Sequence, residues 1–221
     1  MLTADRTAFI RANTRLRPVP LVPEISLYLA DEAVPLWQKT EDELADIGLP
    51  PPFWAFAWAG GQALARYLLD NPASVAGCRV LDLGAGSGLV AIAAARAGAA
   101  PAVAADIEAF CESAIALNAA ANGVHVETLI ADLLDGAAAP APRYDVILAG
   151  DLFYERTTAE RALAFLTRQL EAGTRVLIGD PGRAYLPKQG LRELTTYSVP
   201  VTRELEDTDI KRTAVFALAS G

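Results

Sequence analysis

Three glycines at alternate positions, Gly84, Gly86 and Gly88, stand between an apolar run and an alanine-rich stretch. Glycine lets the backbone turn sharply and approach a ligand closely, and a following helix offers free N–H groups at its N-terminus. The spacing G-x-G-x-G, with Leu89 after the last glycine, departs from the G-x-G-x-x-G pattern of dinucleotide sites. Asp82 precedes this loop, where a carboxylate would oppose a pyrophosphate but suit an ammonium or a sulfonium. The pattern therefore favours S-adenosyl-L-methionine over a nicotinamide dinucleotide as the ligand.

Two further aspartates, Asp106 and Asp132, are expected at the ends of the next two strands. Ligands of open α/β sheets bind at the carboxyl ends of the strands, so Asp106 is placed to accept ribose hydroxyls and Asp132 to meet an adenine edge. The apolar neighbours Ile107 and Leu133 are candidate contacts to the same ligand. Each aspartate alone is equally well explained as a turn residue or a helix cap. Acids at the ends of successive strands indicate a binding edge.

A fourth acid, Asp151, follows the next apolar run and comes shortly before Phe153 and Tyr154. This places one acid and two aromatic rings at the same edge of the expected sheet, beside the ligand. A second aromatic segment, with Trp54, Phe56 and Trp58, lies earlier in the chain, and packing in a core or a lid is the alternative to a binding role for these rings.

The elements that position these residues follow from the hydrophobic periodicity. From residue 78 to residue 180 short apolar runs alternate with alanine-rich helical segments, which is typical of βαβ units in a parallel sheet. Strands are expected at residues 78–84, 101–107, 125–132, 143–151 and 174–180, and helices at 87–98, 109–122 and 158–171. Two later runs, 194–201 and 211–219, are expected to close the sheet as an antiparallel pair. Between them and the fifth strand, Asp180 begins a proline-glycine turn, and Arg183 after it is a candidate to hold an acidic partner.

The first 59 residues differ from the rest, because their prolines interrupt any long element and all three tryptophans fall among them. We expect an N-terminal cap at residues 1–59 and one large α/β domain at residues 60–221. Within the cap, the runs 25–30 and 33–38 are expected to form at most a small hairpin.

Composition narrows the classes of function. The net charge of −8 repels phosphate, so neither nucleic acid nor an anionic membrane surface is an expected partner. Two cysteines and one histidine are too few for a Cys/His zinc site or a disulfide framework, so no metal is expected. The sequence has no stretch of about 20 uncharged apolar residues and no apolar core near its N-terminus, which predicts a cytoplasmic protein.

From residue 60 to residue 221 the chain resembles the class I S-adenosylmethionine-dependent methyltransferases, on its Asp-Leu-Gly-Ala-Gly-Ser-Gly loop and the downstream Asp106. The resemblance implies a Rossmann-like sheet of seven strands, with the last strand antiparallel to the others and helices on both faces. It also implies a cofactor at the carboxyl ends of the first strands, contacted by Trp58 and by the loop and acids named above.

Within that class, Asp151-x-x-Tyr154 resembles the corresponding element of the family 16 protein methyltransferases, and this run lacks the proline of Asn/Asp-Pro-Pro-Tyr motifs. Together with the tryptophan-led segment from Pro52 and the turn that ends at Arg183, it is most similar to the group that methylates lysines of the electron transfer flavoprotein beta subunit. The resemblance implies that subunit as partner, a monomeric enzyme, and Asp151 and Tyr154 as catalytic residues.

A lysine ammonium must lose its proton before it attacks a sulfonium methyl, which costs about 4.6 kcal/mol at pH 7 in water. In this hypothesis Asp151 orients the amine, Tyr154 packs or hydrogen-bonds beside it, and the rings of Trp54, Phe56 and Phe153 contact the substrate. The alternatives are a small-molecule N-methyltransferase of the nicotinamide type, a ribosomal-protein methyltransferase, and a module that binds the cofactor without catalysis. A nicotinamide-dependent oxidoreductase is disfavoured by Leu89.

Overall fold

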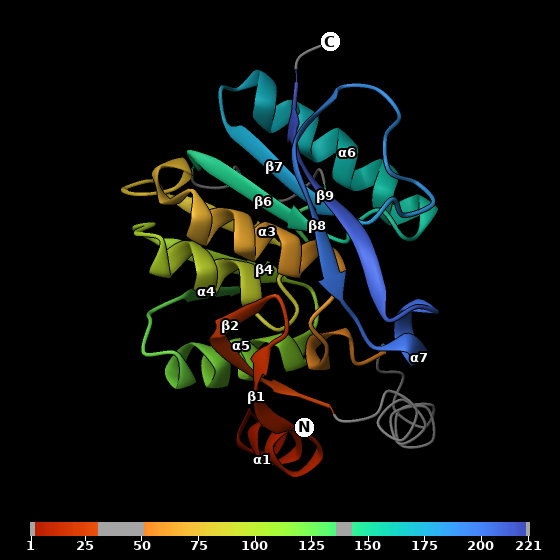
Figure 1. Ribbon diagram of the computed structural model, residues 1–221. Helices are drawn as coiled ribbons and strands as arrows, with labels where there is room; N and C mark the ends of the chain where they lie inside the picture. The colour runs from red at the N-terminus through yellow and green to blue at the C-terminus, as the bar shows by residue number, and fades with distance from the viewer. Residues whose placement is uncertain (1–2, 31–50, 136–142, 220–221) are drawn as a thin grey trace.

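The computed structural model describes residues 3–30, 51–135 and 143–219. The centre of this part of the chain is a sheet of seven strands in the order β5-β4-β3-β6-β7-β9-β8 (Figure 1). Its strands are β3 (Val80–Leu83), β4 (Ala102–Asp106), β5 (Glu127–Ile130), β6 (Val146–Gly150), β7 (Arg175–Asp180), β8 (Leu191–Pro200) and β9 (Ile210–Leu218). Each strand expected from the sequence between residues 78 and 219 is confirmed.

The first five strands of this sheet run parallel, and the last two close it as the sequence predicted. β9 pairs antiparallel with β7 on one side and with β8 on the other. The strand that comes last in the chain therefore lies between two earlier ones and runs against all the others. This is the sheet that the resemblance to class I methyltransferases implies, and the predicted fold class is confirmed.

Helices cover both faces of the sheet because its strands are apolar on both sides. The helices are α3 (Ala59–Asp70), α4 (Leu89–Arg96), α5 (Ala109–Ala121), α6 (Arg156–Glu171) and the short α7 (Arg203–Glu206). Side chains of α3 and α4 pack with Val80, Val146 and Leu148 on one face. On the other face Phe165 and Leu166 of α6 pack with Leu81 and Ile147 and their neighbours, so alternate residues of each strand enter different cores.

The N-terminal part consists of α1 (Thr3–Asn13) and a hairpin of β1 (Arg15–Val19) and β2 (Val22–Leu29). The sequence suggested the runs 25–30 and 33–38 as a hairpin; the second run lies outside the described residues, and the strand that pairs with β2 is β1. Only Pro20 and Leu21 connect them, and so short a connection favours pairing of adjacent strands.

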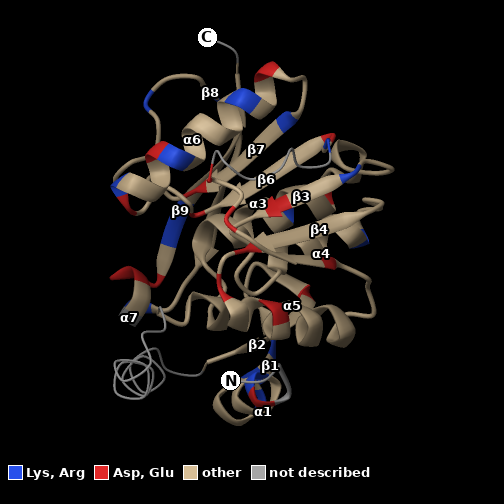
Figure 2. Cartoon of the chain, turned by 180° about the vertical axis from the view of Figure 1, so that it is seen from behind, with Lys and Arg blue, Asp and Glu red and all other residues tan. Residues whose placement is uncertain are grey.

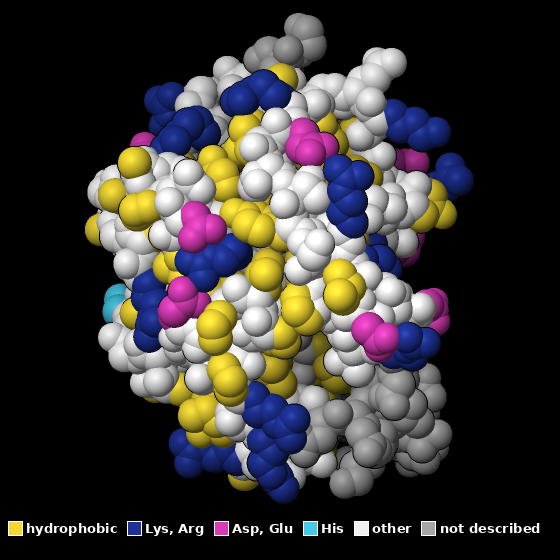
Figure 3. Space-filling model, viewed as in Figure 1, with side chains coloured by type: hydrophobic (Ala, Val, Ile, Leu, Met, Phe, Trp, Pro, Cys, Tyr) yellow, Lys and Arg dark blue, Asp and Glu magenta, His cyan; other side chains and the backbone are white. Residues whose placement is uncertain are grey.

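In Figure 3 basic side chains gather at the end of the molecule where α1 and β1 lie.

This N-terminal part is packed onto the main sheet through α5. The side-chain oxygens of Asn118 and Asn122 accept the N–H groups of Tyr28 and Ser26, at 2.8 and 3.0 Å. The ring of Phe9 meets that of Phe110 edge to face, with centroids 5.6 Å apart. Elements before residue 60 therefore share a core with α5, and the division into a cap at residues 1–59 and a domain at residues 60–221 stays a prediction. No helix in residues 3–30, 51–135 and 143–219 is long and apolar enough to cross a bilayer.

Candidate active site

Acidic residues gather where the central parallel strands end, as Figure 2 shows beside β3, β4 and β6. Asp82 is deeply buried, with 2% of its surface exposed, and its Oδ2 accepts the N–H of Ala91 in the first turn of α4 at 2.9 Å. Burial raises the pKa of Asp82 to about 7, although that hydrogen bond lowers it. Asp82 therefore joins the end of β3 to the helix that follows the glycine loop.

Asp106 holds the glycine loop from the end of β4. Its Oδ2 accepts the N–H of Gly86 at 2.9 Å, and its Oδ1 accepts the N–H of Glu108 at 3.0 Å. The neighbouring Ile107 is 71% exposed. A half-buried carboxylate beside an uncovered apolar side chain suits a ribose joined to a flat base.

The loop itself needs glycine for two different reasons. Gly84 and Gly88 have φ values of 69° and 81°, in the region that disfavours side chains. A Cβ atom on Gly84 would also lie 2.5 Å from Cδ2 of Leu152, in the loop after β6. Glycine at this position therefore lets the loops after β3 and β6 approach one another. The first loop carries Gly86, which binds Asp106, and the second carries the candidate catalytic residue Asp151.

Asp132 differs from the other acids because it has a surface partner of its own. Its Oδ2 forms an ion pair with Arg161 of α6 at 2.7 Å, and its Oδ1 accepts the N–H of Leu134 at 3.0 Å. The bond from Arg161 lowers the pKa of Asp132. Leu133 beside it is half-buried against the core of the α6 face. Contact of either residue with an adenine edge stays a prediction.

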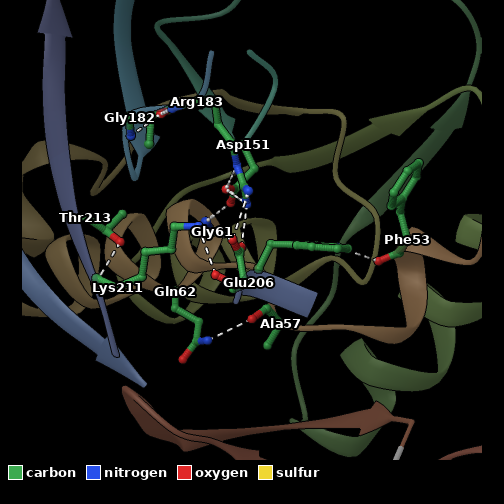
Figure 4. A network of polar contacts seen from close by, with 12 residues as sticks. Phe53, Ala57, Gly61, Gln62, Asp151, Gly182, Arg183, Glu206, Lys211 and Thr213 are labelled. Carbon is green, nitrogen blue, oxygen red and sulfur yellow. Dashed lines mark hydrogen bonds and ion pairs between the residues drawn. The ribbon is translucent and has the colours of Figure 1, made fainter. Parts of the chain in front are cut away.

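Asp151 lies just past β6 in a left-handed conformation, with φ 57°. Its Oδ1 accepts two hydrogen bonds from Arg183, at 3.1 Å from Nε and 2.7 Å from Nη2, and its Oδ2 accepts the N–H of Gly61 at 2.9 Å (Figure 4). Gly61 stands in the first turn of α3, which has no other side-chain cap. Burial raises the pKa of Asp151, whereas Arg183 and the Gly61 N–H oppose that rise.

Arg183 extends this contact to the C-terminal strands. Its Nη1 and Nη2 bind the two carboxylate oxygens of Glu206 at 3.0 and 2.6 Å, and Glu206 also binds Nζ of Lys211 at 2.6 Å. The Arg183 guanidinium lies 5.7 Å from the ring of Trp58. The arginine that the sequence offered for an acidic partner thus holds two acids of its own chain.

The aromatic residues separate into two groups. Trp54, Phe56 and Phe153 are almost fully buried, at 3%, 6% and 0% exposure. Trp54 stacks on Phe110 with centroids 5.6 Å apart, and Phe153 belongs to the core of the α6 face. These three rings pack in cores in this structure, and contact of any of them with a substrate stays a prediction.

The other group is exposed beside Asp151 and includes one ring that the sequence reasoning did not select. Tyr154 is 47% exposed and Phe53 36%, and their ring centroids lie 5.6 Å apart. Phe53 also meets Trp58 at 5.8 Å, and its carbonyl accepts the Trp58 Nε1–H at 3.0 Å. Nothing in the sequence separates Phe53 from Trp54 and Phe56, and only the fold shows that Phe53 is the ring that lies against Tyr154.

Comparison with known proteins places this arrangement in a family. A family model described as lysine methyltransferase matches residues 41–192. The chain belongs to the lysine methyltransferase family. The predicted resemblance to family 16 is confirmed, and with it an enzyme that uses S-adenosyl-L-methionine.

Individual relatives match this methyltransferase over nearly its whole length. The Mus musculus protein named electron transfer flavoprotein beta subunit lysine methyltransferase is 38% identical and covers 95% of this chain and 82% of its own. The Homo sapiens protein of the same name is 35% identical, with 97% of this chain and 82% of its own covered.

Solved structures support the fold. A putative RNA methyltransferase from Pyrococcus horikoshii superposes with a TM-score of 0.56 at 15% identity, covering 82% of this methyltransferase and 98% of that chain. A magnesium protoporphyrin IX methyltransferase from Synechocystis, solved with bound SAH, gives 0.53 at 16% identity over 86% and 100% of the two chains.

The residues of the methyltransferase suit its cofactor. The loop at Gly84–Gly88 turns beside Asp106, whose carboxylate would accept ribose hydroxyls, and the exposed Ile107 would pack on a base. The carboxylate of Asp106 at this edge favours a cationic ligand, which a sulfonium is. When bound, S-adenosyl-L-methionine supplies a methyl group on positively charged sulfur.

Proposed function

We propose that this methyltransferase transfers methyl groups from S-adenosyl-L-methionine to lysine side chains of the electron transfer flavoprotein beta subunit. The observation that carries the proposal is the 38% identity to the mouse enzyme named for that substrate, over 95% of this chain. Similarity over so large a share of the chain includes parts outside the cofactor loop.

The roles of the site residues follow from their positions. Gly84, Gly86, Gly88, Asp82 and Asp106 hold the cofactor, with Trp58, Ile107, Asp132 and Leu133 as further contacts. Asp151 orients the acceptor amine from the end of β6. Tyr154 and Phe53 offer exposed aromatic surface near it, with the half-buried Trp58 against Phe53. Such surface favours a cationic side chain and lowers the pKa of a lysine that loses water.

The acceptor is tested by incubating the purified chain, labelled S-adenosyl-L-methionine and the purified flavoprotein. Label on lysines of the beta subunit, located by mass spectrometry, supports the proposal. A parallel reaction in a lysate that lacks the enzyme separates proteins from small molecules. Label confined to the small-molecule filtrate, or to a ribosomal protein, would reject the proposed acceptor. Binding of cofactor without any label would point to a binding module.

The role of Asp151 is tested with the variant Asp151→Ala. We expect transfer to fall by about 10²-fold or more, as for loss of a group that orients a reactant, while cofactor affinity stays near that of the wild type. Asp209→Ala is the matched control, because Asp209 is an exposed residue whose side chain pairs with Arg203 and not with Arg183 or Asp151. Equal loss of cofactor affinity and transfer in Asp151→Ala would show that the aspartate serves the cofactor instead.

We further propose a monomer that acts in the cytoplasm and binds no nucleic acid. The net charge of −8 disfavours a polyanionic partner. Cys78 and Cys111 are both free thiols, as is usual in a reducing compartment. Size-exclusion chromatography with light scattering tests the monomer.

A further inference from the structure

One arginine bridges two carboxylates that come from distant parts of the chain. Arg183 gives two hydrogen bonds to Oδ1 of Asp151 and two to the carboxylate of Glu206. The side chains are little exposed, at 17% for Arg183, 11% for Asp151 and 3% for Glu206. In such surroundings paired charges are screened weakly, so these contacts fix the geometry more firmly than surface ion pairs do.

The hydrogen bonds that Asp151 already accepts limit how many further donors its carboxylate can bind. A carboxylate offers about four acceptor positions, two on each oxygen. Oδ1 already takes two donors from Arg183, and Oδ2 takes one from Gly61. One position on Oδ2 remains for a further donor, on the oxygen that the N-terminus of α3 holds in place.

We propose that Arg183 is a positioning residue, which holds Asp151 ionised and turned so that one acceptor position on Oδ2 faces an acceptor amine, and that Glu206 keeps Arg183 there. This inference rests on the proposed function, because it takes Asp151 to orient the amine. Glu206 ends α7 and is held by Lys211 of β9, so the C-terminal strands become part of the acceptor site.

The charges around Asp151 explain why an arginine is needed. Glu206 and Asp180 are the nearby carboxylates, and Arg183 and Lys211 are the nearby cations. Burial raises the pKa of Asp151, and the charge and hydrogen bonds of Arg183 act against it. Loss of the guanidinium would leave three carboxylates around one ammonium, so Asp151 would take up a proton at higher pH. A protonated Asp151 could no longer accept a hydrogen bond in the same way from an ammonium.

The test compares Arg183→Gln, Arg183→Lys and Glu206→Gln, with Arg203→Gln as matched control. Arg203 lies in the same short helix as Glu206 and pairs with Asp209 at the exposed surface. We expect kcat/KM for the flavoprotein beta subunit to fall about 10- to 100-fold in Arg183→Gln, chiefly through kcat, with cofactor affinity retained. The acidic limb of the kcat/KM profile against pH should move to higher pH in Arg183→Gln. Glu206→Gln should show the same changes to a smaller degree, and Arg203→Gln none.

Arg183→Lys separates charge from geometry. A lysine retains the positive charge, so the acidic limb should move less than in Arg183→Gln, but its ammonium lacks the planar fork that joins both carboxylates, so kcat should still fall. If Arg183→Gln does not fold, Arg183→Lys and Glu206→Gln decide the question. Wild-type kcat and an unmoved acidic limb in both would overturn the proposal, as would a loss of kcat/KM that cofactor affinity fully explains.

A second readout does not need the acceptor. The titration of the Asp151 carboxyl can be followed by carbon NMR in the wild type and the Arg183 variants, assigned with Asp151→Asn. A higher pKa in Arg183→Gln supports the inference, and an unchanged one overturns it. Failure of the wild type to label the flavoprotein would instead reject the proposed acceptor, so the two failures are distinguishable.

Discussion

A Cβ atom on Gly60 would lie 2.1 Å from the carbonyl oxygen of Gly179, and one on Gly179 would lie 2.2 Å from the carbonyl oxygen of Gly60. The first turn of α3 therefore meets β7 backbone against backbone. This approach brings the N–H of Gly61 to Asp151, at the end of the neighbouring strand β6. The partial positive charge of a helix N-terminus is thus delivered to the carboxylate.

Gly60→Ala is expected to reduce the free energy of unfolding by about 1–3 kcal/mol, because the added methyl group forces backbones apart in a packed core. Urea unfolding measures this. Gly61→Ala is the control: its Cβ would lie 3.8 Å from Val90 in ordinary contact, so we expect a gain of about 0.4–1 kcal/mol from the reduced entropy of the unfolded chain. Similar losses in both variants would contradict the close approach.

Asp106→Asn is expected to weaken the binding of S-adenosyl-L-methionine by about 1.5–3 kcal/mol, because charge-assisted hydrogen bonds to the ribose become neutral ones. Isothermal titration calorimetry measures the change. Asp145→Asn is a suitable control, since Asp145 precedes β6 at the opposite edge of the sheet and accepts the N–H of Arg79. Unchanged affinity in Asp106→Asn would remove that residue from the cofactor site.

Tyr154→Ala is expected to raise KM for the protein acceptor about 10-fold, since it removes an exposed ring that packs on Phe53 and offers a face to a cation. Steady-state kinetics at saturating cofactor measure the effect. Tyr154→Phe retains the ring and serves as its control, so packing alone predicts near wild-type values there. A large fall in kcat in Tyr154→Phe would assign the hydroxyl a part in the reaction.

Asp82→Asn should change how stability depends on pH. Burial raises the pKa of Asp82 to about 7 in the folded chain, against an ordinary value of 3.8. Between these values the folded state keeps a proton that the unfolded state has lost, so Asp82 makes stability fall as pH rises, by on the order of a few kcal/mol in all. The variant lacks this slope, and urea unfolding at about pH 5 and about pH 8 compares the two chains. If the free energy of unfolding changed with pH equally in the wild type and Asp82→Asn, Asp82 would be ionised in the folded chain.

The sequence was most informative where structure is local. The strands β3, β4, β6 and β7 are short apolar runs between turns, and the acids at their ends could be located from the same pattern. The contacts around Arg183 could not be foreseen, because Glu206 and Lys211 resemble any surface pair in the sequence and only the β8–β9 hairpin brings them inward. The burial of Phe153 was missed for a related reason, because the sequence pattern around an aromatic residue at a strand end does not indicate whether its ring faces a ligand or a core.

The placement of β9 also constrains the order in which the molecule can assemble. Within the described chain β8 pairs with β9 alone, and β9 pairs with β7, so β8 joins the sheet only through β9, either after it or together with it as a hairpin. Glu206 lies in the link between those two strands, so its contact with Arg183 requires these strands to be in place. During synthesis, the cofactor loop after β3 can therefore form well before Arg183 and Glu206 are in place around Asp151. The part of the site that binds the acceptor is then completed last.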